Sequence, residues 1–376
     1  MIQTQRLTTA LTPLDVALRL LCSDLRPVRA IEVSLAEAIG CVAAGTSLLK
    51  AALPAFNTAT TDGWALRAHD IVGASSYSPL QLAKSPRWVE AGERLPDNCD
   101  CVLDADLVEQ SGPLFQVLAE AVPGQGVRRA GDDIAAGASI VAAGRRINAS
   151  DVLAARGAGL DRVAVRFPHV RVIDVPASDG STASSQFIFD FARAAGARVT
   201  MLQTSGRDLA SISTALGVEA CDLLVTIGGT GAGRADVAVH AIEECGTLLA
   251  HGIALQPGRT AAAGKIGATP VVAVPGFPDQ TLGVCLALVQ PVLDTLTARI
   301  TRQEMIRPLA RKISSAIGVA EIALLKMSDR AWMPLATGQF SLDAIVSADA
   351  WLAVPGSSEG YAAGTPVGAF PLREMS

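Results

Sequence analysis

The stretch CDLLVTIGGTGAGRADVAVHAIEECG, residues 221–246, decides the class of fold. Its first seven residues form an apolar run that is typical of a strand buried on both faces, and residues 235–246 have the apolar spacing of a helix. The glycine-rich segment 228–233 lies between them. A strand, a glycine-rich link and a helix in this order are typical of a parallel α/β sheet, in which ligands bind at the carboxyl ends of the strands.

The same alternation continues on both sides of this stretch. Short apolar strands alternate with helical segments: a strand over 169–175, a helix over 182–197, a strand over 198–203, a helix over 208–217 and, within 270–298, a strand, a Pro-Gly-Phe-Pro turn and a long apolar helix. This pattern indicates a parallel sheet covered by helices on both faces. We therefore predict an α/β domain over residues 168–304.

The flanking segments have a different pattern. Helices are predicted over 13–25, with Thr12 as N-cap, and from Ser34, where Glu37 completes a capping box. Residues 77–167 contain short strands broken by Gly and Pro, and the end of the chain is similar. The predicted fold class is α/β plus β in a multidomain chain, with an irregular β-rich N-terminal region over 1–167, the central α/β domain, and a small C-terminal β domain over 305–376.

Composition excludes several classes of protein. A chain of 376 residues with 50% hydrophobic residues is expected to form more than one globular domain. The formal net charge of −5 argues against a general nucleic-acid surface. The chain shows no signal-peptide pattern and no apolar run long enough to cross a membrane. Its seven cysteines have neither paired nor zinc-ligand spacing, so we expect free thiols in the cytoplasm.

Two short motifs of the α/β region suit an anionic ligand. The glycines of GGTGAG (228–233) would let backbone N–H groups approach a phosphate, although a tight turn explains them equally well. Arg259 follows a Pro-Gly turn in QPGRT (256–260), and its planar guanidinium suits an oxyanion. An exposed arginine on a turn is the simpler alternative.

Two further motifs carry carboxylates. Asp132 and Asp133 follow Gly131, and adjacent carboxylates in a glycine-rich loop can hold a hard cation such as Mg²⁺. Asp62 stands between Thr61 and the pair Gly63-Trp64 in a stretch of small residues. For both motifs a solvated surface turn remains the alternative.

The order of these pieces resembles one family over nearly the whole chain, the molybdopterin molybdotransferases of the MoeA and gephyrin E-domain type. LPAFNTATTDGWALRAHD (53–70) is similar to the loop with the family's Asp-Gly-Tyr-Ala signature, and RRAGDDI (128–134) to its Gly-Glu-Asp-Ile loop. GGTGAGRAD (228–236) resembles the Gly-Gly-Val-Ser loop. QPGRTAAAGKIGATPVVAVPGFP (256–278) resembles the Lys-Pro-Gly-Lys-Pro stretch with the following Pro-Gly-Asn-Pro.

The resemblance implies a function and a set of site residues. The family forms a homodimer and inserts molybdate into adenylylated molybdopterin, releasing AMP, with a divalent cation, expected to be Mg²⁺. The implied catalytic and metal-binding carboxylates are Asp62, Asp133 and Asp236. The implied residues for binding the pterin nucleotide and the oxyanion are Ser184, Ser185, Gly228, Gly229, Arg259, Pro275 and Gly276.

Departures from the family pattern leave a second interpretation open. The segment DVPASDG (174–180) stands in place of a Thr-Gly-Asp-Glu turn, and Gln256 and Arg259 replace two lysines. Arg234 replaces an acidic residue and Phe277 an asparagine. The alternative is a catalytically altered homologue that binds molybdopterin or a related anion. Such a protein would be a scaffold, or an accessory to a molybdoenzyme or to another protein of cofactor biosynthesis.

Overall fold

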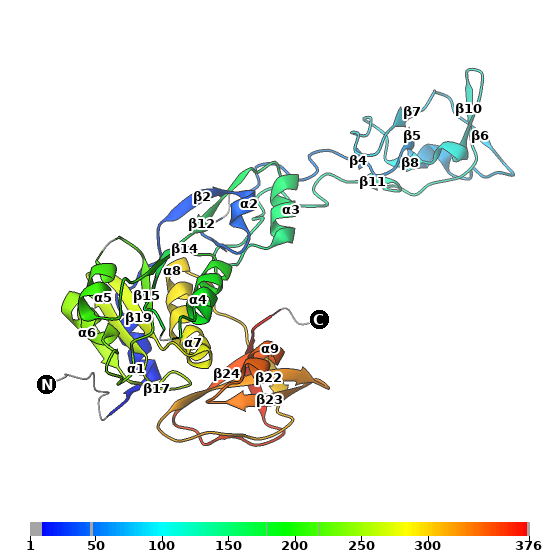
Figure 1. The fold of residues 1–376 in the computed structure, drawn as a ribbon. Helices are drawn as coiled ribbons and strands as arrows, with labels where there is room; N and C mark the ends of the chain where they lie inside the picture. Colours follow the sequence, from blue (N-terminus) through cyan, green and yellow to red (C-terminus); the bar gives the residue numbers. More distant parts are fainter. Residues whose placement is uncertain (1–9, 46–47, 178, 218, 374–376) are drawn as a thin grey trace. The chain divides into compact units, whose positions relative to one another are not determined.

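The computed structural model describes residues 10–45, 48–177, 179–217 and 219–373, and the chain divides into two compact units (Figure 1). Unit 1 comprises residues 1–45, 143–149 and 162–376, and unit 2 comprises residues 46–142 and 150–161. The first nine residues, which were part of the signal-peptide prediction, lie outside the described ranges. The boundaries predicted at residues 167 and 304 stay a prediction.

The centre of unit 1 is a six-stranded sheet in the order β14-β13-β15-β19-β18-β16. Four neighbouring strands are parallel, as predicted: β14 (Arg198–Gln203), β13 (His169–Asp174), β15 (Leu223–Ile227) and β19 (Thr269–Val274). The last two strands in this order, β18 (Ala262–Ile266) and the edge strand β16 (Thr247–His251), are antiparallel to their neighbours. The sequence did not predict these two, because small residues and glycines interrupt any apolar run there.

Helices cover both faces of this sheet. Val170 and Val172 of β13 pack in one core with helices α1 (Leu14–Cys22), α4 (Ala183–Ala194), α7 (Pro278–Val284) and α8 (Gln290–Thr297). Ile173 packs in a second core with α5 (Leu209–Leu216) and α6 (Ala238–Cys245). A π-helical turn, Cys285–Val289, joins α7 to α8. None of the helices in the described ranges is both long and apolar enough to span a bilayer.

The first predicted helices are shorter in the structure. Thr12 does not cap α1, because Thr12 and Pro13 form the extended strand β1 and pair with Ile253 and Ala254. The capping box of Ser34 with Glu37 is confirmed, but its helix α2 spans only Leu35–Ala38. A glycine with positive φ, Gly40, follows the helix.

The remaining strands of unit 1 confirm a β-rich end of the chain. Strands β20 (Met305–Pro308), β22 (Ala320–Ser328), β23 (Ala331–Thr337), β24 (Ala350–Val354) and β26 (Pro366–Pro371) form one sheet with β1 and β17 (Ile253–Gln256). Helix α9 (Leu342–Ser347) and the pair β21 (Ile313–Ser314) with β25 (Gly360–Tyr361) complete this part. A separate small sheet consists of β2 (Ala30–Ser34), β12 (Arg162–Arg166) and β3 (Val42–Ala43).

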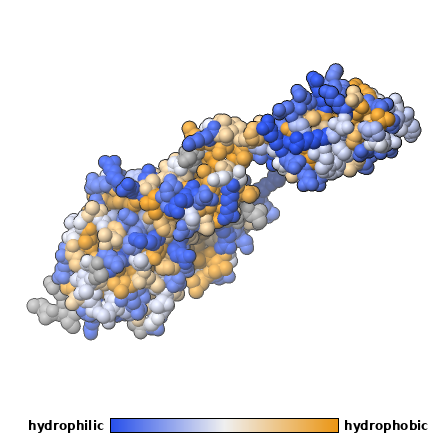
Figure 2. Space-filling view, turned by 90° about the horizontal axis from the view of Figure 1, so that it is seen from above, coloured by the Kyte–Doolittle hydropathy of each residue, from blue (hydrophilic) through white to orange (hydrophobic). Residues whose placement is uncertain are grey.

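Unit 2 has the irregular β structure that the sequence predicts. Its sheets are β7-β5-β8, β6-β10-β9 and β11-β4, with bounds β4 (Thr58–Ala59), β5 (Gly63–Leu66), β6 (Leu80–Gln81), β7 (Arg87–Val89), β8 (Cys101–Leu103), β9 (Val108–Ser111), β10 (Leu114–Val117) and β11 (Val127–Arg128). The 3₁₀ turns Ala68–Ile71 and Ala105–Leu107 and helix α3 (Ala149–Gly157) accompany them. Hydrophilic and hydrophobic residues are interspersed over the face of each unit shown in Figure 2.

Candidate functional site

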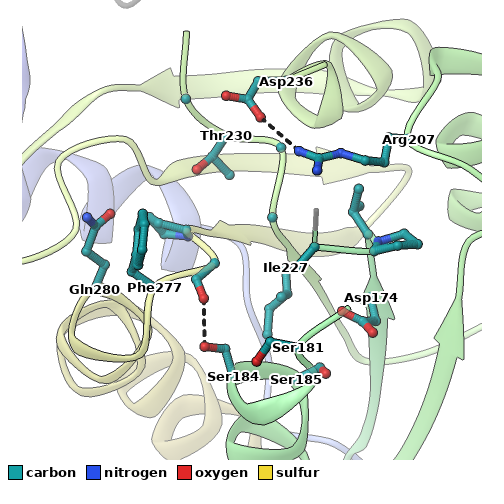
Figure 3. A pocket seen from close by; sticks show the side chains of 18 of the residues that line it. Asp174, Ser181, Ser184, Ser185, Arg207, Ile227, Thr230, Asp236, Phe277 and Gln280 are labelled. Atoms are coloured by element: carbon teal, nitrogen blue, oxygen red, sulfur yellow. Dashed lines mark hydrogen bonds and ion pairs between the residues drawn. The ribbon is translucent and has the colours of Figure 1, made fainter. Parts of the chain in front are cut away.

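A cavity of about 420 Å³ lies at the carboxyl ends of the central strands of unit 1 (Figure 3). The last residues of β13, β15 and β19 are in register, with Asp174 opposite Ile227 and Ile227 opposite Val274. The chain continues from β13 to β14 on one side and later to β15 on the other, so the strand order reverses between β13 and β15. Ligands of open α/β sheets bind at such a switch point.

Two glycines shape the loop at the end of β15. Gly228 and Gly229 have φ angles of 86° and 67°, a conformation that is costly for residues with a side chain. The N–H of Gly228 donates to the carbonyl of Val274, and the carbonyl of Gly229 accepts from the N–H of Ala238 at the start of α6. The backbone of this loop therefore forms part of the cavity wall, and the N–H of Gly228 is already bonded to Val274.

The start of α4 forms another wall. Ser184 Oγ donates to the carbonyl of Gly276 at 2.7 Å, which ties the helix to the turn after β19 (Figure 3). Ser185 Oγ donates to the carbonyl of Thr182 at 2.9 Å. The first turn of α4 contains no acidic residue, and Thr182 makes no side-chain cap. A helix N-terminus of this kind favours an anion.

The cavity contains an ion pair that the sequence did not predict. Arg207, in the segment between β14 and α5, approaches Asp236 with an N–O distance of 3.8 Å (Figure 3). Asp236 also accepts from the N–H of Gly233 at 2.9 Å. The Nε of Arg207 is buried and has no acceptor among the described residues. This guanidinium can therefore donate a hydrogen bond to an oxyanion in the cavity.

Acidic side chains outnumber basic ones in this cavity. Among the described residues that line it, Arg207 is the only basic one, while Asp174, Asp179 and Asp236 are acidic. Asp174 is buried at the end of β13, and its carboxylate accepts from Gln203 Nε2 at 3.1 Å. An aspartate that ends an apolar strand is the signal that could have identified Asp174 from the sequence.

The rim of the cavity carries an aromatic side chain. Phe277, where the family has asparagine, is 71% exposed and lines the cavity beside Gln280 (Figure 3). Thr230 lies on another wall, and its hydroxyl is 3.2 Å from that of Thr260. The departure at residue 277 thus changes a surface that a ligand would touch.

Arg259 lines a neighbouring cavity of about 220 Å³. The two cavities share Thr260 and Gln280, so they are adjacent. Arg259 is exposed, and its backbone carbonyl accepts from the N–H of Ile253. Asp279 lines the same cavity and lowers its net positive charge.

The predicted carboxylates Asp62 and Asp133 belong to unit 2. Asp62 is exposed and accepts from the N–H of Ala91 at 2.7 Å. Asp133 is 3.4 Å from Arg128. Within the described ranges, no group of three or more His, Cys, Asp or Glu side chains is arranged to hold a metal ion. Their role in metal binding stays a prediction.

Most of the residues predicted to bind substrate lie together in unit 1. One cavity is lined by Ser184, Ser185, Gly228, Gly229, Asp236, Pro275 and Gly276. Arg259 lies in the adjoining cavity. Arg207, Asp174, Asp179 and Gln280 also line the main cavity and were not predicted. Arg207 lies between β14 and α5 and outside any recognisable motif, so the sequence around it did not indicate a binding role.

Two family models match the chain. Residues 12–159 match the MoeA N-terminal region (domain I and II), and residues 172–295 match a probable molybdopterin binding domain. The molybdopterin molybdenumtransferase 2 of Mycobacterium tuberculosis is 27% identical and covers 73% of this chain and 77% of its own. The molybdopterin molybdenumtransferase of Synechococcus elongatus is 25% identical, with coverage of 84% and 88%. A crystal structure of the molybdopterin biosynthesis MoeA protein from Pyrococcus horikoshii is 26% identical, has a TM-score of 0.73, and covers 97% of this chain and 100% of its own.

Proposed function

Because this chain belongs to the MoeA family, we propose that it acts in molybdenum cofactor biosynthesis and inserts molybdate into adenylylated molybdopterin, with release of AMP. The family models together match most of the chain, and several similar proteins are named molybdopterin molybdenumtransferases. The observation that carries the proposal is the cavity at the carboxyl ends of β13, β15 and β19.

The lining of this cavity supports binding of a phosphorylated substrate. The start of α4 presents backbone N–H groups, the loop at Gly228 and Gly229 lines the cavity with its backbone, and Arg207 supplies a guanidinium. Arginine forms paired hydrogen bonds with phosphate oxygens, which would orient the substrate as well as bind it. We propose that these groups hold the phosphates of the pterin nucleotide.

The excess of carboxylates supports a divalent cation. A phosphoryl group beside Asp174, Asp179 and Asp236 would be repelled unless a cation lay between them. Carboxylate and phosphate oxygens are the ligands that Mg²⁺ prefers, and the ion would offset charge on the phosphates. Asp236 fits this role, and we keep Asp62 and Asp133 as further candidates for metal binding and catalysis.

We propose that the molybdate oxyanion binds beside Arg259. The cavity of Arg259 adjoins the main one, so an oxyanion there would lie next to a substrate in the main cavity. Asp279 opposes this charge, which predicts weak affinity for a free dianion. We also propose a homodimer and a cytoplasmic location, both expected from the sequence.

The test compares two arginines near the same loop. Arg207→Gln should reduce AMP release from adenylylated molybdopterin, molybdate and Mg²⁺ by about tenfold or more, because a charged partner of the phosphate is lost. Arg234→Gln is the matched control, since Arg234 is exposed and does not line the cavity. Its activity should equal that of the wild type.

Two outcomes would contradict the proposal. Equal activity of Arg207→Gln and wild type would remove Arg207 from the site. Tight binding of adenylylated molybdopterin by a wild-type protein that releases no AMP would instead favour the catalytically altered homologue.

A further inference from the structure

A third cavity, of about 630 Å³, lies between α8 and the strands β24 and β26 of unit 1. It shares no lining residue with the cavities described above. Its volume is in the range of sites for small molecules, about 300–1,000 Å³. The proposed molybdate insertion assigns it no role.

One wall contains an arginine whose charge is compensated. Arg302 donates from Nε and from a terminal nitrogen to the two carboxylate oxygens of Asp294, at 2.7 and 2.9 Å. The side-chain amide of Gln290, with its oxygen turned toward Arg302, accepts from the same guanidinium. Asp294 is therefore engaged by Arg302 and is the only acidic residue among the described residues that line this cavity.

The same wall contains a second arginine without such a partner. The backbone N–H of Arg299 donates to the carbonyl of Asp294, but its guanidinium forms no hydrogen bond or ion pair with any described residue. Burial lowers the pKa of Arg299, repulsion from Arg302 lowers it further, and the charge of Asp294 only partly offsets this. The nitrogen atoms of this half-buried guanidinium are not sealed from water, so an anion in the cavity could pair with them.

The opposite wall is apolar and aromatic. Trp351 of β24 and Phe370 of β26 have ring centroids 5.2 Å apart and planes inclined by 37°. Leu286 and Ile300 also line the cavity. The cavity therefore has a basic side and a side suited to a flat apolar group.

We propose that this cavity binds a small organic anion, with a phosphate or carboxylate group paired to Arg299 and a flat ring against Trp351 and Phe370. A guanidinium binds either oxyanion through two parallel hydrogen bonds. The ring would cover apolar surface that the cavity leaves open to water. A ligand with both features should bind more tightly than one with either alone.

The test uses phenyl phosphate and benzoate as probes on the full chain labelled with 5-fluorotryptophan. The chain has four tryptophans, and Trp351→Phe identifies the resonance of Trp351. We expect both probes to shift this resonance in a saturable way in the millimolar range that is typical of fragments. The probe that binds with the lower Kd shows whether the cavity prefers a phosphate or a carboxylate group. Inorganic phosphate and benzyl alcohol, which lack the ring or the charge, should each bind about tenfold more weakly.

Charge variants separate recognition from folding. Arg299→Gln should weaken both probes by about tenfold or more, and Arg299→Lys should restore part of the affinity because it keeps the charge. Arg311→Gln, at an exposed arginine outside the cavity, should bind as the wild type does. An unshifted Trp351 resonance, or equal affinity in wild type and Arg299→Gln, would overturn the inference. Because none of these measurements uses molybdopterin, they are independent of the proposed insertion reaction.

Discussion

At the scale of single residues, Asp236 contacts two different groups of the main cavity. Its carboxylate accepts from the N–H of Gly233 and lies near Arg207. The first contact orders the glycine-rich loop, while the second places a negative charge beside the only basic side chain described in that cavity. These contacts leave two roles for the carboxylate: a partner of Arg207, or a ligand of a cation that binds with the phosphate.

We expect Asp236→Asn to weaken AMP binding at saturating Mg²⁺ by about tenfold, because the cation loses a charged ligand. The amide oxygen of asparagine can still accept from Gly233, so the loop should keep its shape. Calorimetry with and without Mg²⁺ measures the effect. Tighter AMP binding in the variant, whether or not Mg²⁺ is present, would show instead that Asp236 only competes for Arg207.

Asp62 offers a comparable test in unit 2. If it only accepts the hydrogen bond of Ala91, then Asp62→Asn should keep that bond and cost at most about 1 kcal/mol of stability. We expect more, namely an intact fold with ligand affinity or AMP release reduced by about tenfold, since a charged partner is removed. The measurements are affinity for adenylylated molybdopterin and AMP release at matched Mg²⁺. Equal affinity and equal AMP release in wild type and Asp62→Asn would show that Asp62 only stabilises the turn.

The sequence predicted the glycines of the site more readily than its charges. Gly228 and Gly229 follow an apolar strand directly, so their position at a strand end can be read locally. Arg207 reaches the cavity only because β14 lies beside β13, which is a long-range pairing. The glycine at position 63 has a structural reason that the sequence does not reveal. An added Cβ there would lie 2.1 Å from the carbonyl oxygen of Leu103, so the pairing of the strands requires glycine.

At the scale of elements, local signals predicted three strands of the central sheet. The segments 169–175, 198–203 and 221–227 contain β13, β14 and β15. The apolar runs of β13 and β15 are buried throughout, whereas β14 lies at the edge of the sheet and is mostly exposed. Strand β18 is rich in alanine and has no such signal, yet its pairing with β19 buries it. Its position depends on tertiary contacts rather than on propensity.

Helix α5 provides a pH-dependent prediction. Asp208 caps this helix, and hydrogen bonds from the hydroxyl and the N–H of Ser211 lower the pKa of its carboxyl from 3.8. A lowered folded-state pKa means that the stabilisation is complete above the ordinary pKa and is lost as the pH falls through the folded-state value. The melting-temperature difference between wild type and Asp208→Ala should therefore be larger near neutral pH than near pH 3.

A matched control is Asp190→Ala, an exposed aspartate of α4 that caps no helix. Its effect on the melting temperature should be smaller than that of Asp208→Ala at neutral pH. If the melting-temperature difference between wild type and Asp208→Ala grew as the pH fell, the result would contradict this prediction.

At the scale of the whole molecule, pairing between distant segments limits what a linear sequence can predict. Strand β2 near residue 32 pairs with β12 near residue 164, so the chain leaves unit 1 and returns to it. Local composition indicated short strands over residues 77–167 but contained no sign of β2 or of this pairing. The partners of such strands are decided by burial over the whole fold.

The thiols lead to a prediction about stability. All seven cysteines are free, and burial raises the pKa of Cys41 to about 11 and of Cys101 to about 12. Fewer than about one in a thousand Cys41 side chains would be ionised at pH 8, so oxidation should be slow. We expect reductant plus chelator to leave the melting temperature unchanged. A lower melting temperature in that mixture would reveal a disulfide or a structural metal.

The proposed homodimer leads to the last prediction. We place its interface at the apolar start of the chain, where Ile39 is 55% exposed although isoleucine is usually buried. Light scattering should give twice the mass of the 38.7 kDa chain at micromolar concentration, and Ile39→Asp should shift the mass toward the monomer, because an interface core excludes charge. Val346→Asp, at an exposed apolar residue of α9, is the matched control and should stay dimeric. A mass of 38.7 kDa for the wild type would contradict the dimer, whereas an unaffected Ile39→Asp dimer would place the interface elsewhere on the chain.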